Sequence, residues 1–126
     1  MMYHKAKLFG DSDACTKVLR ASNPGEAKAI GREVVGFNQK TWDEKRFEIV
    51  VNANLAKFGQ NNELRDFLIN TGSRVLVEAS PVDKIWGIGL AQDNSAAENP
   101  NNWKGLNLLG FALMEVRDQL RNQQGA

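Results

Sequence analysis

Apolar residues recur every three or four positions along most of this chain, the spacing that places them on one face of an α-helix. The longest such pattern predicts a helix over about 41–58, and another predicts a helix over about 105–121. The two stripes consist of Phe47, Val50, Val51, Asn54, Leu55 and Phe58 in the first helix, and of Leu106, Leu109, Leu113, Val116 and Leu120 in the second.

Residues that favour helix ends divide the remaining chain into shorter helices. Asn23 can cap a helix that begins at Pro24, and Glu26 stands where the acidic residue of a capping box belongs. Thr41 and Glu44 repeat this pattern at the start of the longest helix. Further helices are expected over about 1–9, 11–21, 23–36 and 61–69.

A short β-branched run follows these helices. Residues 74–79 are largely apolar and stop at Ser80-Pro81, where proline has no amide hydrogen to continue a ladder. We expect a strand over 74–79, a second short strand over about 84–88 and a loop over 92–102. The pattern predicts a mainly α fold with a small β element, in a single compact multihelical domain.

The composition is that of an ordinary globular domain. The chain has 126 residues, of which 42% are hydrophobic and 25% are charged. Its net charge of +1 carries little information about partners, but its basic and acidic residues are interspersed along the predicted helices, which disfavours the basic face of a duplex-binding module. Cys15 and His4 are the single cysteine and histidine, so we expect no disulfide and no zinc site. No apolar run approaches the roughly 20 residues that span a bilayer, so we expect a cytoplasmic protein.

Candidate chemistry gathers in the turn between the two predicted strands. Glu78 and Asp83 flank a Ser-Pro turn, so their carboxylates can share acid and base work in one cleft, or Glu78 can simply face outward from an alternating strand. Trp86 and Trp103 can stack on a base or a sugar, or they can fill the core. Gly87-Ile88-Gly89 lacks the third glycine of a dinucleotide fingerprint, which favours a close backbone approach instead.

Lys5 is a candidate nucleophile on the first predicted helix. It shares a face with Met1, Met2 and Leu8. A lysine that is desolvated by such neighbours loses its proton more easily and can form an imine with a sugar aldehyde. The alternative is a lysine whose stem covers apolar surface while its ammonium group reaches solvent.

Several blocks that span nearly the whole chain carry a family resemblance. The most specific are the block from Glu78 to Gly89 and the Trp-x-Gly-x-Asn block that begins at Trp103. The others are Met1 to Asp11, Gly31-Arg32, Trp42 with Arg46, Asn99-Pro100, Leu109-Gly110, Met114 and Arg117. Together these blocks resemble the NADAR domain family, also called the YbiA-like family.

This resemblance implies an N-glycosidase that needs neither a metal nor a cofactor. Its substrates would be small-molecule ribosyl nucleotides, either phosphorylated ribosylamino-pyrimidine intermediates of riboflavin synthesis or ADP-ribose on a guanine base, which a nucleic acid can carry. Lys5 is implied as the residue that forms an imine with ribose C1, while Asp83 or Glu78 transfers protons. Substrate contacts are implied for Trp86, Gly87, Trp103 and Asn107. A phosphate group would need an arginine or a lysine, for which Arg32, Lys28 and Arg46 are the candidates.

One departure from the family pattern concerns the start of the chain. Family members normally begin with a strand-rich segment that ends in Glu-x-Tyr before the position of Met1, and that glutamate is a site residue. We expect the chain to be a NADAR domain over 1–126 that lacks this segment. The alternative function is a non-catalytic ADP-ribose or nucleotide-binding module that keeps the pocket at Asp83 and Trp86.

Overall fold

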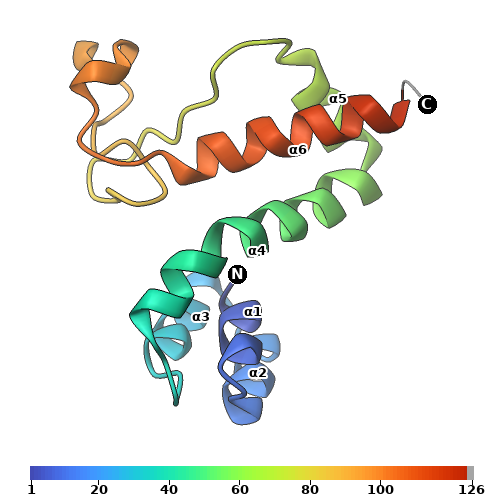
Figure 1. Ribbon diagram of the computed structural model, residues 1–126, viewed down its shortest axis with the longest axis vertical. Helices are drawn as coiled ribbons and strands as arrows, with labels where there is room; N and C mark the ends of the chain where they lie inside the picture. Colours follow the sequence, from blue (N-terminus) through green and yellow to red (C-terminus); the bar gives the residue numbers. More distant parts are fainter. Residues whose placement is uncertain (125–126) are drawn as a thin grey trace. The chain divides into compact units, whose positions relative to one another are not determined.

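Six α-helices and two short 3₁₀ helices make up the regular structure of residues 1–124, the part of the chain that the computed structural model describes (Figure 1). The prediction of a mainly helical fold is confirmed. The chain divides into two compact units, Met1–Ile49 and Val50–Ala126. The helices are α1 (Met2–Leu8), α2 (Ser12–Leu19), α3 (Pro24–Arg32), α4 (Gln39–Gln60), α5 (Asn62–Asn70), η1 (Ser95–Glu98), η2 (Pro100–Asn102) and α6 (Leu108–Gln124).

The first unit is built on three short helices, α1, α2 and α3, which pack against one another (Figure 1). Small side chains allow this close packing: the buried cluster consists of Ala6, Ala14 and Val34, with Phe9, Cys15 and Ile30 against it. Gly31 in α3 lies directly against the side chain of Met2, where any larger residue would collide with it. The small residues therefore hold α3 close to α1, the helix that carries Lys5.

The capping residues of the first unit behave largely as the sequence predicts. Asn23 accepts a hydrogen bond from the backbone N–H of Glu26 at 2.8 Å, and the Glu26 carboxylate accepts one from the backbone N–H of Ser22 at 3.2 Å. Asn23 is thus the N-cap as predicted, but Glu26 binds the N–H of Ser22 and not that of the N-cap, so the reciprocal half of the capping box is not formed. The start of α4 was predicted wrongly, because Asn38 and not Thr41 accepts the capping hydrogen bond, from the N–H of Thr41 at 3.0 Å.

Two of the predicted helices differ from the observed ones at their ends. The helix α3 ends at Arg32 and not near Gly36, whose backbone adopts a left-handed φ of +80°. The helix α6 begins at Leu108 and not at 105, because Asn107 has a φ of +53° that no α-helix accommodates. At its other end α6 continues to Gln124 and not to about 121 as predicted.

The second unit is organised by α6, which packs against α5 (Figure 1). Two arginines of α6 bind groups at the end of α5 and just beyond it. Arg121 donates to Ile69 and Gly72, and the buried Arg117 donates to the Thr71 hydroxyl at 2.9 Å. These cations face the carbonyl end of the helix dipole, where positive charge is favourable. The apolar core of this unit comprises Val50, Val51, Leu68, Ile88, Leu90, Ala112, Val116 and Leu120.

The two predicted strands were wrong for the residues that the structure describes. Residues 74–79 form no regular secondary structure and pair with no strand, and residues 84–88 form a series of bends. Backbone groups that would form hydrogen bonds to a neighbouring strand bind a side chain instead. Asn107 donates through its side-chain amide to the carbonyl of Leu76 at 3.0 Å and accepts from the N–H of Glu78 at 2.9 Å. A side-chain amide has therefore replaced a neighbouring strand.

Within residues 1–124, no helix combines the length and the apolar character that a membrane crossing requires. The predicted loop over 92–102 contains the short helices η1 and η2, each capped by an asparagine side chain.

The carboxylate of Asp11 joins two segments of the first unit, and this contact predicts a pH-dependent stability. Hydrogen bonds from the backbone N–H groups of Val35 and Ala14 hold the pKa of Asp11 below its ordinary value. A carboxyl group with a lowered folded-state pKa stabilises the fold above its unfolded pKa, and this contribution is lost as the pH falls through the folded pKa.

We expect Asp11→Ala to lower the melting temperature most above about pH 5, with the difference from the unmodified chain shrinking toward pH 3. Thermal unfolding followed by circular dichroism across this range measures the effect. Asp13→Ala is the control, because Asp13 is an exposed acid in the same helical turn. A pH-independent difference would contradict this account.

Candidate active site

Lys5 lies on α1 with its ammonium group against two aromatic rings of the first unit. Its Nζ is 4.6 Å from the ring centroid of Phe37 and 5.6 Å from that of Trp42. Trp42 is buried, and Lys5 itself is partly buried. Desolvation by burial lowers the pKa of Lys5 below its ordinary value, so more of the amine is neutral at a given pH. This is the state in which a lysine acts as a nucleophile.

The aromatic neighbours of Lys5 come from the start of α4 and the loop before it. Trp42 belongs to a matched block of the sequence, but sequence reasoning missed Phe37. Phe37 lies outside every helical stripe, between the left-handed Gly36 and the α4 cap Asn38, so no periodicity marks it. A ring of Phe9 packs edge-on against Phe37 with centroids 5.2 Å apart, which holds Phe37 beside α1.

The predicted phosphate ligand Arg32 is an exposed residue in the last turn of α3. Its neighbour Gly31 contacts Met2, as described above, so Arg32 follows directly on the contact between α3 and α1. A second cation of the first unit, Arg46, is largely covered and forms an ion pair with Asp43 at 3.1 Å. Arg32 is therefore the more accessible of these two guanidinium groups.

Asp83 organises a tight turn of the second unit through one carboxylate oxygen. Its Oδ1 accepts hydrogen bonds from the N–H of Trp86 at 2.8 Å and from that of Ile85 at 3.0 Å. The backbone N–H of Asp83 in turn donates to the Ser80 hydroxyl at 3.1 Å. Both of these hydrogen bonds to the carboxylate end on Oδ1. The turn after Pro81 is thus held by side chains and not by a sheet.

The turn at 83–88 is bound tightly to the start of α6. Carbonyl groups of 84–87 accept from successive backbone N–H groups at 106–109, over distances of 2.9–3.1 Å. The first amides of a helix have no partner within the helix, so these carbonyls take the place of a capping side chain. Two glycines allow the approach. A Cβ at Gly87 would lie 2.8 Å from the carbonyl oxygen of Asp83, and one at Gly105 would collide with the Gly87 carbonyl.

Gly87 and Asn107, both predicted to contact substrate, make close structural contacts in the second unit. Asn107 is fully buried and uses its amide to bind Leu76 and Glu78. Gly87 is buried between the carbonyl groups of Asp83 and Glu78. Both residues position the turn that carries Asp83 and Trp86. The close backbone approach at Gly87 agrees with the one that the Gly-Ile-Gly pattern predicted.

Glu78 does not face the same surroundings as Asp83. Its carbonyl oxygen accepts the backbone N–H of Ile88 at 3.0 Å, which places it beside the turn. Glu78 also lines an apolar pocket of about 190 Å³, together with Phe58, Phe67, Leu68, Leu76 and Leu109. A carboxylate in such a pocket could act as an acid or a base only if a polar group of the substrate entered the pocket. The idea that Glu78 and Asp83 share one cleft gains no support from these contacts.

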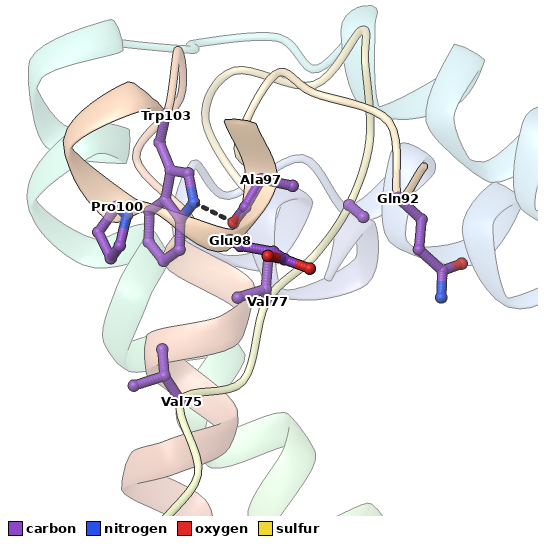
Figure 2. A pocket seen from close by; sticks show the side chains of 8 residues that line it. Val75, Val77, Gln92, Ala97, Glu98, Pro100 and Trp103 are labelled. Atoms are coloured by element: carbon purple, nitrogen blue, oxygen red, sulfur yellow. Dashed lines mark hydrogen bonds between the residues drawn. The ribbon is translucent and has the colours of Figure 1, made fainter. Parts of the chain in front are cut away.

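Trp103 lies in a separate, open groove of about 820 Å³ (Figure 2). Its indole N–H donates to the carbonyl of Ala97 at 2.8 Å, so the ring is held by η1 with one face along the groove. The remaining wall consists of Val75, Val77, Ala79, Gln92, Glu98 and Pro100. Trp86 is partly buried in the turn at 83–88. The structure thus leaves Trp103 available for stacking and does not bury it in the core.

The structure brings five of the eight predicted residues into one hydrogen-bonded assembly of the second unit. Backbone or side-chain hydrogen bonds connect Glu78, Asp83, Trp86, Gly87 and Asn107, whereas Trp103 lies in the neighbouring groove. Lys5 and Arg32 belong to the first unit. Among residues 1–124 no group of three His, Cys, Asp or Glu side chains is arranged to hold a metal ion.

The chain belongs to the NADAR domain family, whose family model matches residues 1–121. It is 46% identical over 124 residues to an N-glycosidase of Acanthamoeba polyphaga mimivirus, covering 98% of this chain and 72% of that protein. It is 42% identical over 125 residues to protein irg-1 of Caenorhabditis elegans, covering 98% of this chain and 59% of the relative. It is 34% identical over 118 residues to N-glycosidase YbiA of Escherichia coli, covering 94% of this chain and 67% of that protein.

These comparisons define the class of the protein. Curated relatives at up to 46% identity over nearly the whole chain are named N-glycosidases, so the family relationship assigns the chain to this class of hydrolases. The chain spans only 59–72% of the length of these three relatives. The substrates of the full-length relatives are therefore only proposed for this chain.

Asn107 provides a test of the account of the second unit. We expect Asn107→Ala to lower the free energy of unfolding by about 2–4 kcal/mol, because the partly buried Leu76 carbonyl and Glu78 N–H lose their partner. Asn107→Gly should be similarly destabilised, although glycine accepts the positive φ without strain. Urea unfolding followed by tryptophan fluorescence measures both variants.

Asn122→Ala, on the exposed surface of α6, is the matched control and should change stability by less than about 0.5 kcal/mol. If Asn107→Gly were as stable as the unmodified chain, the backbone conformation and not the side-chain amide would explain the asparagine.

Proposed function

We propose that this protein is an N-glycosidase that hydrolyses the bond between ribosyl C1 and a nitrogen atom, through an imine on Lys5. The observation that carries the proposal is the environment of Lys5, a lysine whose pKa is lowered by burial against Phe37 and Trp42. The N-glycosidase relatives support the reaction class. An imine requires a neutral amine, and desolvation favours the neutral form of Lys5 by lowering its pKa.

The proposed reaction proceeds in two steps on a ring-opened N-ribosyl compound. In the first step the neutral amine of Lys5 attacks C1, the bond from C1 to Nζ forms, and the bond from C1 to the substrate nitrogen breaks. The departing nitrogen receives a proton and leaves as an amine. In the second step water adds to the imine carbon, the bond to Nζ breaks, and the ribosyl aldehyde is released while Lys5 regains its free amine.

Each step needs a group that moves a proton, and Asp83 is the better of the two candidate carboxylates. Its Oδ1 holds the turn while Oδ2 has no part in those two hydrogen bonds, so one oxygen orients the side chain and the other can exchange a proton. Glu78 is the second candidate, but it lines an apolar pocket. Trp86 and Trp103 are proposed to stack against the base or the sugar.

The proposed substrates are ribosyl nucleotides, either an ADP-ribosylated guanine base or a phosphorylated ribosylamino-pyrimidine. Both present a ribosyl–nitrogen bond near a phosphate. Arg32 is proposed to bind that phosphate because its guanidinium is exposed and because arginine matches phosphate oxygens with paired N–H donors.

Lys5→Ala tests the imine directly. We expect turnover of an ADP-ribosylated guanine nucleoside to fall about a thousandfold or more, since loss of a nucleophile removes the covalent path. Borohydride added during turnover should attach the ribosyl mass to Lys5, as peptide mass spectrometry would detect. Lys7→Ala is the matched control, because Lys7 is an exposed lysine on the same helix.

Three outcomes separate the alternatives. Full turnover by Lys5→Ala would contradict the imine mechanism. Binding of ADP-ribose in a calorimeter without turnover by the unmodified chain would instead support a non-catalytic binding module. Turnover without a trapped adduct would indicate direct hydrolysis by water.

Asp83→Asn separates proton transfer from turn formation. Asparagine keeps the oxygen that accepts from Ile85 and Trp86, so the turn should survive, whereas the titrating group is lost. We expect kcat to fall by about a hundredfold or more with a melting temperature close to that of the unmodified chain. Unchanged kcat would exclude Asp83 as the proton-transfer group, and steady-state kinetics with a thermal melt measure both quantities.

A further inference from the structure

The loop between α3 and α4 brings Phe37 to Lys5, and the turn that follows α1 binds this loop. The backbone N–H of Val35 donates to Oδ2 of Asp11 at 2.8 Å, while Oδ1 of the same carboxylate accepts from the N–H of Ala14 at 3.0 Å. One carboxylate therefore caps α2 and holds the loop. Val35 lies only two residues before Phe37, so this hydrogen bond fixes the loop close to the ring.

The same turn contacts the loop at a second point. The ring of Phe9 packs edge-on against Phe37, with ring centroids 5.2 Å apart. Between the two contacts the chain turns at Gly36, whose φ of +80° favours glycine. A Cβ at Gly36 would lie 3.4 Å from the carbonyl oxygen of Phe9. The loop is thus held on both sides of this glycine.

These two contacts set the path of the loop from the core to Lys5. Val34 belongs to the buried cluster of the first unit, but Val35 is 74% exposed and Phe37 is 39% exposed. Neither of the exposed residues is held by burial. A segment that lacks burial depends on its hydrogen bonds and local contacts for a fixed position. The Phe37 ring that lies 4.6 Å from the Lys5 Nζ is therefore placed by Asp11 and Phe9.

We propose that Asp11 is a positioning residue for the imine reaction, because its carboxylate holds the loop that keeps Phe37 over the Lys5 amine. The inference rests on the proposed function of Lys5 as the nucleophile. Burial lowers the pKa of Lys5, so the contact that holds the covering ring also determines how much water reaches the amine. All of these contacts lie within the first unit.

Asp11→Asn tests the proposal because asparagine has a single acceptor oxygen. It can still cap α2 at the N–H of Ala14, since asparagine is a favoured N-cap residue, but it cannot also accept from Val35. We expect the pKa of Lys5 to rise toward its ordinary value as water reaches the amine. Loss of a negative charge by itself would lower the pKa of a lysine, so the direction of the change separates positioning from a direct effect of charge.

Two measurements follow the change, both made well below the melting transition of each variant. Acylation of the amines by acetic anhydride across pH, followed by peptide mass spectrometry, gives the pH midpoint of Lys5 without any turnover, and Lys7 is the internal reference. This midpoint should move upward in Asp11→Asn. Steady-state kinetics should show kcat lowered by about tenfold or more, since a displaced reacting group loses its alignment.

Asp13→Asn is the matched control, because Asp13 is an exposed acid in the first turn of the same helix. It should leave both the Lys5 midpoint and kcat unchanged. Phe9→Leu provides a second route that does not depend on the folding of Asp11→Asn. It removes the edge-on ring but keeps an apolar side chain, and it should also move the Lys5 midpoint upward.

A double-mutant cycle tests whether Asp11 acts through Phe37. Phe37→Ala should raise the Lys5 midpoint by itself, and the addition of Asp11→Asn should raise it no further, because the contact that Asp11 holds is already absent. Two independent effects would instead add.

An unchanged or lowered Lys5 midpoint in Asp11→Asn would overturn the proposal, and so would additive effects in the cycle. A raised midpoint in a chain that shows no turnover would support the positioning contact while contradicting the proposed function. The two failures are therefore distinguishable.

Discussion

The buried amide of Asn107 is the contact on which the second unit depends. It binds Leu76 and Glu78, and from the same position the chain turns into α6. Its left-handed backbone ends the preceding segment and directs the first amides of α6 toward the carbonyl groups of 84–87. A short irregular segment, a turn and a helix start are thereby joined without a sheet. These contacts satisfy backbone groups of the turn that carries Asp83 and Trp86.

The candidate chemistry of the first unit follows from close helix packing. Small residues such as Ala6 and Gly31 bring α1 and α3 together, and Phe37 and Trp42 then cover the Lys5 ammonium group. Removal of water from an amine disfavours its charged form, so the packing itself tunes the reactivity of Lys5. A lysine on a solvated helix face would have an ordinary pKa and would be a poor nucleophile at neutral pH.

Much of the helical structure could be predicted from the sequence because its signals are local. The Asn23 cap, the Asp11 cap and the apolar stripe of α6 each depend on residues within one or two turns. The strands at 74–79 and 84–88 were predicted wrongly, because a β-branched run indicates extended backbone but not its partner. The partner proved to be the Asn107 side chain, about thirty positions along the chain, as the sequence separations of 29 and 31 show.

The sequence by itself determined the helical class, the helix caps, the family and the residue types that the proposed reaction requires. Only the tertiary structure decided their surroundings. It packed Gly87 and Asn107 against the turn that carries Asp83, placed Glu78 in the wall of an apolar pocket and brought Phe37 and Trp42 to Lys5. The physical reason is that desolvation and hydrogen-bond partners depend on which distant segments meet, whereas helix periodicity and capping depend only on neighbours in the chain.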